Sequence, residues 1–322
     1  MKYNNNNGDS DFFGCLLTYF KANRLELKDI NKIRNEVYLL SLQDGTKFII
    51  KGFPDQHKWA VQRKLSALLE RSRFSNSYKF ITTLDPFKYN RILYSFIEYI
   101  PPHEKRFDFD TMNNRREGME LLSRFHEHSA VFVPNFNDKL PRFQLLRKWS
   151  ERFYLFLHNL PIIRRFVAID ILDQWIWWAN WSLRGVFANL QYETLERQVI
   201  IHGDVAHHNF LRSKDGNLYL IDFDLIAIAP PMFDYLQYAN RLLPVIASHE
   251  EIWAYPQLAA YRYNQLFLYG LAFPTDIFRE WNRVISSGLS KSDEQIYYVW
   301  KLTAKHFPFR MALNHAILEM VL

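Results

Sequence analysis

Three polar side chains in the second half of the chain have the types and the spacing for metal-assisted chemistry. Asp204 comes shortly after the apolar run "VII", Asn209 comes five residues later, and Asp222 comes thirteen residues after Asn209, within "LYLIDFD". A carboxylate in an apolar strand is costly unless it is paired or bound to a metal. Carboxylate and amide oxygens on rigid strand ends suit Mg²⁺, which takes its remaining ligands from water and substrate phosphates.

The segment between Asn209 and Asp222 predicts how these residues meet. "NFLRS" and "LYLIDFD" are strand-like and flank the turn "KDGN", which predicts a β-hairpin. The hairpin brings Asn209 near Asp222, and we expect Asp204 beside them, placed to accept a proton from an attacking hydroxyl. The two intervals match the base, amide and metal-carboxylate order of kinase catalytic loops. These are the parts that phosphoryl transfer uses.

Two other interpretations of the same segment stay open. Asp-Gly pairs and asparagines are ordinary turn formers, so the hairpin also has a purely structural explanation. His202, His207 and His208 suggest a zinc site, but neighbouring histidines in a tight loop seldom converge on one ion, and Cys15 is the only cysteine. Without zinc, His202 braces the loop through hydrogen bonds while the other two histidines line the site or face solvent.

Three motifs in this half of the chain resemble a known superfamily. "HGDVAHHN", "LIDFD" and "PPMFDYLQYANRLL" are similar to motifs of the aminoglycoside phosphotransferase and choline kinase superfamily, and the resemblance extends from about Ile33 to Leu243. The upstream "LLSRFHEHS", the lack of a glycine-rich loop and the form "IDFD" are closest to the bacterial spore-coat-associated kinases of the CotS type. The resemblance implies an α+β, protein-kinase-like fold in two lobes, with a small antiparallel sheet in the N-terminal lobe and a mostly helical C-terminal lobe.

The resemblance also implies ATP and Mg²⁺ as cofactors and a role for each candidate residue. It assigns Asp204 as the catalytic base, with His202 in the same loop, and Asp234 as the residue that steadies this loop. Asn209 and Asp222 are the implied Mg²⁺ ligands, with Asp224 as a further carboxylate. Lys51 would bind the nucleotide phosphates, and the segment at Glu98 and Ile100 would bind the nucleotide base. The implied activity is transfer of a phosphoryl group to a hydroxyl or amine of a small molecule.

Two departures from the superfamily pattern bear on whether the protein is active. Gln62 stands about where a glutamate usually pairs with Lys51, and Glu70 comes two turns too late for that role. The segment "KIRNEV" between the first two strands contains no glycine, so a glycine-rich phosphate cradle is missing. The alternative to an active enzyme is therefore a weak or inactive kinase relative that serves as a structural component of the spore coat.

The interval between Asp222 and Asp234 favours a small acceptor over a protein one. Only eleven residues separate these two aspartates, which leaves no room for the long phosphorylatable segment of regulated protein kinases. We expect the acceptor to bind between the catalytic loop and the helices at about 141–190 and 245–322.

Two clusters in the helical region have both a functional and a structural interpretation. Trp175, Trp177, Trp178 and Trp181 could form an aromatic box around a cationic head group. Positions 175, 178 and 181 recur at helical spacing, however, which is typical of core packing. Basic residues concentrate between Arg142 and Arg165, where they form either a solvated helix face or a surface for an anionic partner.

Hydrophobic spacing and turn residues predict a small sheet lobe followed by helices. The predicted strands are 25–33, 36–42, 46–53, 78–87 and 91–100, and the predicted helices include 9–23, 57–72, 111–132, 141–159 and 164–190. Pro101 and Pro102 end the sheet part. We therefore expect a nucleotide-binding lobe at 1–100, with its first ten residues disordered, and a helical catalytic and acceptor-binding lobe at 101–322.

Bulk properties narrow the location and the partners. The chain has 322 residues, a formal net charge of +6 and one cysteine, which excludes an internal disulfide and fits a reducing compartment. No apolar run approaches the ~20 residues that cross a bilayer, and the polar start has no secretory-signal pattern. We predict a protein without a membrane span, in the cytoplasm of a mother cell or in the spore coat. Its expected partners are a nucleotide, a small acceptor and, for the CotS-type assignment, spore coat proteins, but no nucleic acid.

Overall fold

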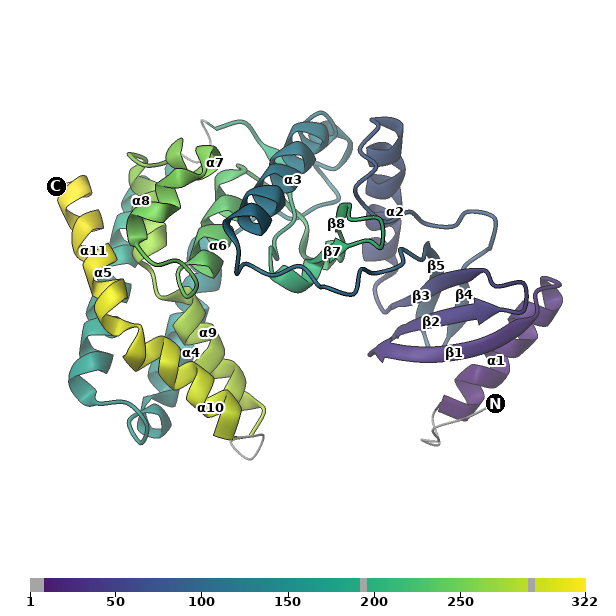
Figure 1. Ribbon diagram of the computed structural model, residues 1–322, viewed down its shortest axis with the longest axis horizontal. Helices are drawn as coiled ribbons and strands as arrows, with labels where there is room; N and C mark the ends of the chain where they lie inside the picture. Colours follow the sequence, from purple (N-terminus) through teal and green to yellow (C-terminus); the bar gives the residue numbers. More distant parts are fainter. Residues whose placement is uncertain (1–8, 192–195, 289–292) are drawn as a thin grey trace. The chain divides into compact units, whose positions relative to one another are not determined.

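The computed structural model of the protein, shown in Figure 1, describes residues 9–191, 196–288 and 293–322. Contacts divide the chain into two compact units: the first contains residues up to Arg106 together with Phe210–Asp224, and the second contains Phe107–Asn209 and Leu225–Leu322. The hairpin segment after Asn209 thus groups with the N-terminal residues, although the sequence suggested a simple division near Pro101. Most of the predicted disordered tail lies outside the described residues, and α1 begins at Asp9.

The first unit is built on a five-stranded antiparallel sheet in the order β1-β2-β3-β5-β4. Its strands are β1 (Leu27–Arg34), β2 (Val37–Leu42), β3 (Lys47–Phe53), β4 (Phe87–Tyr89) and β5 (Ile92–Glu98). The predicted hairpin turn between β2 and β3 is confirmed, with Gly45 at φ 88°, a conformation that glycine adopts without strain. Apolar side chains of α1 (Asp9–Ala22) pack against this sheet. The fully buried members of this cluster are Leu16, Phe20, Leu40, Ile50 and Phe96.

The fourth strand is shorter and later than the predicted strand at 78–87. Pairing with β5 begins early, since Ile81 N donates to Phe96 O and Glu98 N donates to Lys79 O, both at 2.9 Å. The ladder then breaks in "TTLDP", where Pro86 has no N–H to donate. Only Phe87–Tyr89 resumes regular pairing.

One helix and one hairpin complete the first unit. The helix α2 (Gln56–Arg71) begins after Asp55, whose side chain accepts a hydrogen bond from His57 N at 2.8 Å, as helix N-caps do. The predicted hairpin forms from β7 (Phe210–Arg212) and β8 (Leu218–Leu220). Leu220 N donates to Asn76 O at 2.9 Å, which ties the hairpin to the segment after α2.

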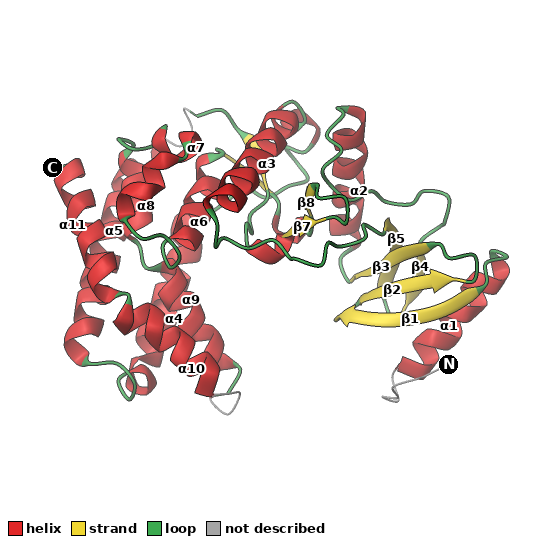
Figure 2. Cartoon of the chain, in the orientation of Figure 1, coloured by secondary structure: helices red, strands yellow, loops and turns green. Residues whose placement is uncertain are grey.

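The second unit is mostly helical, as Figure 2 shows. Its helices are α3 (Met112–Ala130), α4 (Leu145–Ile163), α5 (Ile169–Asn189), α6 (Met232–Leu242), α7 (Pro256–Ala259), α8 (Gln265–Ala272), α9 (Thr275–Ser286), α10 (Asp293–Trp300) and α11 (Phe307–Val321). Helix α5 packs on α8, and α4 packs on α9. A two-stranded ladder joins β6 (Val199–Ile201) to β9 (Ala227–Ala229) and leads into the loop that begins at His202. The predicted α+β, protein-kinase-like architecture, with a sheet in one lobe and helices in the other, is confirmed.

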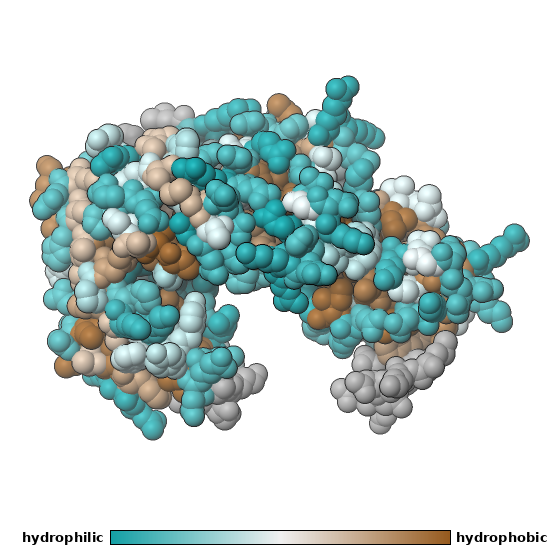
Figure 3. All heavy atoms as spheres, viewed as in Figure 1, coloured by the Kyte–Doolittle hydropathy of each residue, from teal (hydrophilic) through white to brown (hydrophobic). Residues whose placement is uncertain are grey.

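The aromatic residues are mostly core material. Trp175 and Trp178 are completely buried, and Trp175 Nε1 donates to Thr303 O at 3.0 Å. The packing interpretation of these two tryptophans therefore holds, while Trp177 is half exposed. On the face drawn in Figure 3, hydrophilic side chains predominate and hydrophobic ones form small separate patches. Within the described residues, no helix combines the length and the apolar character needed to cross a membrane.

Candidate active site

In the first unit, a buried lysine gathers two of the predicted carboxylates. Lys51 lies on the central strand β3, paired with β2 on one side and β5 on the other. Its Nζ donates to Asp222 Oδ1 at 3.0 Å and to Asp224 Oδ1 at 2.6 Å. Asp222 comes two residues after the end of β8, and Asp224 lies in the short 3-10 turn Phe223–Leu225. The hairpin thus delivers both acids to the strand lysine.

Asp222 is held in an unusual conformation and in a cationic environment. Its φ of 69° lies in the left-handed region, which non-glycine residues seldom adopt and which is common at functional sites. Burial alone would raise the pKa of this carboxyl, but Lys51 and Arg34 hold it well below its ordinary value. Arg34 Nη2 donates to Asp222 Oδ2 at 2.7 Å. The carboxylate is therefore charged at neutral pH.

Arg34 was missed in the sequence. It ends β1 at the glycine-free turn, and the register of β1 against β2 shifts between Lys32 and Arg34. The only available signal was a basic residue in the turn where a phosphate cradle was expected. That signal does not indicate a contact with an acid 188 positions away.

Lys51 has an acidic partner although Gln62 stands in place of the usual glutamate. Its side chain is buried on α2, where Nε2 donates to Asp224 Oδ1 at 2.8 Å and Oε1 accepts from the Tyr78 hydroxyl at 3.0 Å. Burial raises the pKa of Tyr78 well above its ordinary value, and the charges of Asp222 and Asp224 raise it further, so the hydroxyl keeps its proton. Asp224 therefore supplies the negative charge that a glutamate on α2 would otherwise give to Lys51.

The predicted nucleotide-base segment lies at the end of β5. Glu98 is the last residue of that strand and is exposed, while Ile100 follows it and is half-buried. The N–H of Glu98 is already used by Lys79 O. A nucleotide base at this edge would therefore contact the remaining backbone groups of the segment. The role of Glu98 and Ile100 stays a prediction.

In the second unit, Asp234 organises the loop that follows β6. This aspartate lies in the first turn of α6 and is fully buried. Its Oδ2 accepts from His202 N at 2.6 Å and bonds His126 Nε2 at 2.9 Å, while its Oδ1 accepts from Gly203 N at 2.9 Å. Burial would raise the pKa of Asp234, but the hydrogen bonds with His126 and Gly203 N hold it below its ordinary value. The buried His202 enters this arrangement through its backbone N–H.

Gly203 is required by the loop's conformation. Its φ is 79°, and a Cβ at this position would lie 2.1 Å from Leu225 O. Any side chain would therefore force the loop away from the segment after the hairpin. The glycine fixes the direction in which the next residue, Asp204, leaves the backbone.

Asp204 is held by two side chains. Asn209 Nδ2 donates to Asp204 O at 2.8 Å and to Asp204 Oδ2 at 3.2 Å, so the predicted base and the predicted amide ligand are in contact. Arg241 Nη2 from α6 donates to Asp204 Oδ1 at 3.2 Å. The Asp204 side chain remains one-third exposed, so its carboxylate is open to groups from outside the protein.

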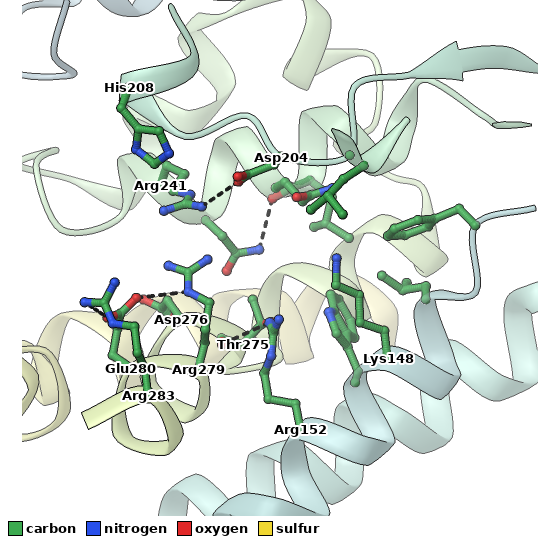
Figure 4. A pocket seen from close by; sticks show the side chains of 18 residues that line it. Lys148, Arg152, Asp204, His208, Arg241, Thr275, Asp276, Arg279, Glu280 and Arg283 are labelled. Carbon is green, nitrogen blue, oxygen red and sulfur yellow. Dashed lines mark hydrogen bonds and ion pairs between the residues drawn. The ribbon is translucent and has the colours of Figure 1, made fainter. Parts of the chain in front are cut away.

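A cavity of about 340 Å³ opens beside Asp204 within the second unit. Side chains from α4, α6, α9 and the loop after β6 line it, and several of them are charged (Figure 4). The basic members are Lys148, Arg152, Arg241, Arg279 and Arg283, and the acidic members are Asp204, Asp276 and Glu280.

Part of this lining could be anticipated from the basic region around α4. Lys148 and Arg152 are four residues apart and flank Trp149, which is buried, so they share the inward side of an amphipathic helix. Arg147, the residue immediately before Lys148, is exposed and pairs with Glu151. In the sequence, the spacing of each basic residue from the buried apolar residues of α4 would have separated the inward-facing Lys148 and Arg152 from the exposed Arg147. Arg279 lies on α9, within the region at 245–322 that was expected to border the acceptor, but no spacing pattern singled it out.

The zinc interpretation gains no support from the described residues. No three side chains of histidine, cysteine, aspartate or glutamate gather there as a metal-binding group. His208 lines the cavity, and burial together with the charge of His208 lowers the pKa of His207.

The predicted residues thus form two groups, one in each unit. Lys51, Asp222 and Asp224 belong to the first unit, whereas Asp204 and Asn209 belong to the second. The contact between Asp204 and Asn209 agrees with their five-residue spacing, whereas the ion pairs of Lys51 with Asp222 and Asp224 were not predicted from the sequence. The meeting of Asn209 with Asp222 on one divalent cation, with Asp204 beside them and free of the metal, stays a prediction.

Comparison with proteins of known structure indicates the same fold. The chain is 16% identical to an aminoglycoside phosphotransferase from Alicyclobacillus acidocaldarius, with 92% of each chain covered and a TM-score of 0.67. It is 14% identical to the choline kinase LicA from Streptococcus pneumoniae, with 97% of this chain and 99% of that one covered and a TM-score of 0.50. A spectinomycin phosphotransferase in complex with ADP and spectinomycin is 13% identical over 95% of this chain and 98% of its own, with a TM-score of 0.54.

Residues 27–271 match the model of a single protein family, described as the phosphotransferase enzyme family. The match spans β1 to α8 and includes Lys51, the loop after β6, the hairpin and Asp234. It therefore contains both groups of candidate residues and most of the chain. The protein belongs to the phosphotransferase enzyme family.

Proposed function

We propose that this protein is an ATP- and Mg²⁺-dependent phosphotransferase that acts on the hydroxyl or amine of a small molecule. The main support is Asp204, a partly exposed carboxylate held by Asn209 and Arg241 beside a cavity. Lys51, buried and bonded to Asp222 and Asp224, is suited to bind nucleotide phosphates. Similar folds are described with ADP and with GDP, which favours a purine nucleotide as the phosphoryl donor.

In the proposed reaction, Asp204 is the general base. The acceptor hydroxyl gives its proton to a carboxylate oxygen of Asp204 while its oxygen bonds to the γ-phosphorus of ATP. The bond from that phosphorus to the β,γ-bridging oxygen breaks, and ADP leaves with the electron pair. Asn209 and Arg241 hold the base in position, and Asp234 and His202 hold the loop.

Asp222 is the residue best suited to bind Mg²⁺. Its carboxyl is ionised despite burial, and magnesium prefers hard, anionic oxygen ligands. Both of its oxygens have cationic partners, Lys51 on one and Arg34 on the other, so a metal ion would replace Arg34. When bound, Mg²⁺ would neutralise charge on the β- and γ-phosphates. Asn209 and Asp224 are the further proposed oxygen donors.

Nucleotide binding tests this proposal. We expect isothermal titration to detect ATP binding that strengthens when Mg²⁺ is present, and Asp222→Ala to remove the Mg²⁺-dependent part. Asp215→Asn, in the exposed turn of the same hairpin, is the matched control and should bind as the wild type does. Mg²⁺-dependent ATP binding that is unchanged in Asp222→Ala would contradict the role of Asp222.

Turnover gives a separate test of the base. Asp204→Asn keeps the shape of the side chain and should lower kcat for ADP release by at least 10²-fold, because general-base catalysis contributes about 10²–10⁴-fold. ATP affinity should stay within twofold. Full ADP release by Asp204→Asn in the presence of an acceptor would remove Asp204 from the proposed mechanism.

A location in the spore coat, or in the mother cell that assembles it, is a narrower proposal supported by the CotS-type motifs. Its alternative form is a structural coat protein with little activity, which the glycine-free turn and the Arg34–Asp222 ion pair favour. Imaging of a fluorescent fusion during sporulation, in wild-type and Asp204→Asn strains, separates these forms. Normal coat assembly in the Asp204→Asn strain favours the structural role.

A further inference from the structure

The cavity beside Asp204 has more positive than negative side chains. Five basic and three acidic residues line it. Glu280 is shared by two arginines, with Oε1 2.9 Å from Arg279 Nε and Oε2 2.5 Å from Arg283 Nη2. Asp276 is paired at 3.3 Å with Arg310, which comes from α11 and does not line the cavity. Each acidic side chain of the lining therefore already forms an ion pair with at least one arginine.

Two basic residues of the cavity have no acidic partner among the described residues. Lys148 Nζ lies 5.3 Å from the centroid of the Phe143 ring, and no carboxylate contacts it. Arg152 Nη1 donates to the hydroxyl and, at 3.3 Å, to the carbonyl of Thr275, which fixes the guanidinium without neutralising it. Both side chains are half-buried, so water compensates their charge only in part.

Burial, together with repulsion between neighbouring basic groups, lowers the pKa of three basic residues in the cavity. Burial and the neighbouring Arg152 lower the pKa of Lys148. Burial and the charge of Arg279 lower the pKa of Arg152 to about 10 and also lower the pKa of Arg241. Repulsion between basic groups that are held close together raises the free energy of the protein. An anion that binds among these groups relieves the repulsion.

The side chains are arranged to converge on one space. Figure 4 shows the charged ends of Lys148, Arg152, Arg241 and Arg279 directed toward a common region next to Asp204. They come from three helices, α4, α6 and α9, so their positions are fixed by packing rather than by one flexible loop. Trp149 stacks on Phe273 at 4.5 Å between ring centroids and gives this region a rigid apolar support. A volume of about 340 Å³ suits a small molecule.

We propose that the acceptor of this enzyme is a small hydroxyl-bearing anion whose carboxylate or phosphate group binds to Lys148 and Arg152 while its hydroxyl faces Asp204. This inference rests on the proposed function, since it assigns the cavity to the acceptor of that reaction. It also excludes cationic acceptors such as choline, which the excess positive charge would repel.

Binding of simple anions by the full-length protein tests the site before any substrate is known. Melting temperature is measured at constant ionic strength with inorganic phosphate, glycerate, glycerol 3-phosphate, glycerol and choline chloride. We expect the anions to raise the melting temperature and glycerol and choline to leave it unchanged. Comparison of glycerate with glycerol 3-phosphate shows which anionic group the site prefers.

Charge-removing variants locate the anion. In Lys148→Gln and Arg152→Gln, the apparent affinity for the best anion should fall by about tenfold or more, because each hydrogen bond to a charged group is lost. Arg147→Gln, on the exposed side of α4, is the matched control and should bind the anion as the wild type does. Equal anion-induced shifts in all four proteins, or a shift with choline instead, would overturn the proposal.

Two further measurements separate this inference from the proposed function. ATP affinity should stay within twofold in Lys148→Gln and Arg152→Gln, and a parallel loss of ATP and anion binding would assign the cluster to the nucleotide and overturn the inference. ADP release should be stimulated by glycerate or glycerol 3-phosphate more than by glycerol. Anion binding at Lys148 without any ATP binding or turnover contradicts the proposed function, whereas turnover with choline contradicts only the anionic acceptor.

Discussion

At the scale of single residues, the ionic contacts of Lys51 explain how the protein replaces a missing glutamate. The amide of Gln62 donates to Asp224 and accepts from Tyr78, so its orientation is determined from both sides. A neutral donor at this position is compatible with the carboxylate of Asp224 bound to Lys51 at 2.6 Å. The departure from the superfamily pattern is therefore compensated locally, by an acid from the end of the hairpin.

The substitution Gln62→Glu tests this compensation. It would bring a second carboxylate next to Asp224, whose Oδ1 now lies 2.8 Å from Gln62 Nε2. The loss of this hydrogen bond and the repulsion between the two carboxylates both destabilise the folded state. We expect the free energy of unfolding at pH 7 to fall by about 1–3 kcal/mol. Chemical denaturation measures the change.

A double-mutant cycle identifies the cause of that loss. In an Asp224→Asn background the second carboxylate no longer meets a like charge, so the penalty of Gln62→Glu should largely disappear. Glu70→Gln, on the exposed part of the same helix, should change stability by less than about 0.5 kcal/mol. An equal penalty in both backgrounds would indicate a steric effect and contradict the electrostatic explanation.

At the scale of elements, the β6 loop depends on one buried aspartate at the start of α6. Asp234 joins the first turn of that helix to the backbone of His202 and Gly203 and to His126 of α3. Three separate elements thus determine where Asp204 lies. The contact between His126 and Asp234 also gives a structural role to the first histidine of the "HEH" motif on α3, which in the sequence supported only a resemblance.

The pH dependence of stability follows from the lowered pKa of Asp234. Because the folded pKa lies below the unfolded one, the unfolded state takes up a proton first as the pH falls. The stabilisation is therefore complete above the ordinary aspartate pKa of about 3.9 and is lost as the pH drops through the lower, folded value. Asp234→Asn should be clearly less stable than the wild type at pH 7.

Denaturant unfolding across a pH series checks this prediction. The difference in unfolding free energy between wild type and Asp234→Asn should be constant from pH 7 to about pH 5 and should shrink below about pH 4. Asp215→Asn, whose carboxyl lies in an exposed turn, provides the control series. A difference that grows on acidification would mean that the folded pKa is raised and would refute the assignment.

At the scale of the whole molecule, the chain builds two units with cores of different kinds. The first combines a five-stranded sheet with an aromatic cluster from α1 to β5, and the second buries tryptophans between helices. Phe20 is completely buried in the first core, where its ring lies 5.8 Å from that of Phe48 and 6.0 Å from that of Phe96. Stability is therefore expected to differ between the two units.

The substitution Phe20→Ala tests whether α1 is part of the first core. Removal of a buried aromatic ring costs about 3–5 kcal/mol. Hydrogen exchange should show the largest loss of protection in β2, β3 and β5, and a smaller one in α5 and α8. Leu17→Ala, on the exposed side of the same helix, should have little effect. Unchanged protection in the sheet would mean that α1 does not stabilise it.

The local elements were largely predictable because hydrophobic periodicity and turn residues act over short distances. The strands around Gly45, the hairpin between Asn209 and Asp222, and the helices predicted at 111–132, 141–159 and 164–190 all lie within a few residues of their predicted positions. The strand predicted at 78–87 is the exception. There an apolar run was interrupted by Pro86, whose effect on pairing depends on the neighbouring strand.

By itself, the sequence determined which residue types could support phosphoryl transfer and how far apart they lie, because "HGDVAHHN" and "LIDFD" have this order in the chain itself. Only the tertiary structure decided which charges are paired. The contacts of Arg34 with Asp222 and of Gln62 with Asp224 join residues that are distant in sequence. Lys148, which has no carboxylate partner in the described part of the chain, differs from the paired Arg147 in the direction that its side of the helix faces. Electrostatic energy depends on distance in space and on burial, and neither quantity is written in the order of residues.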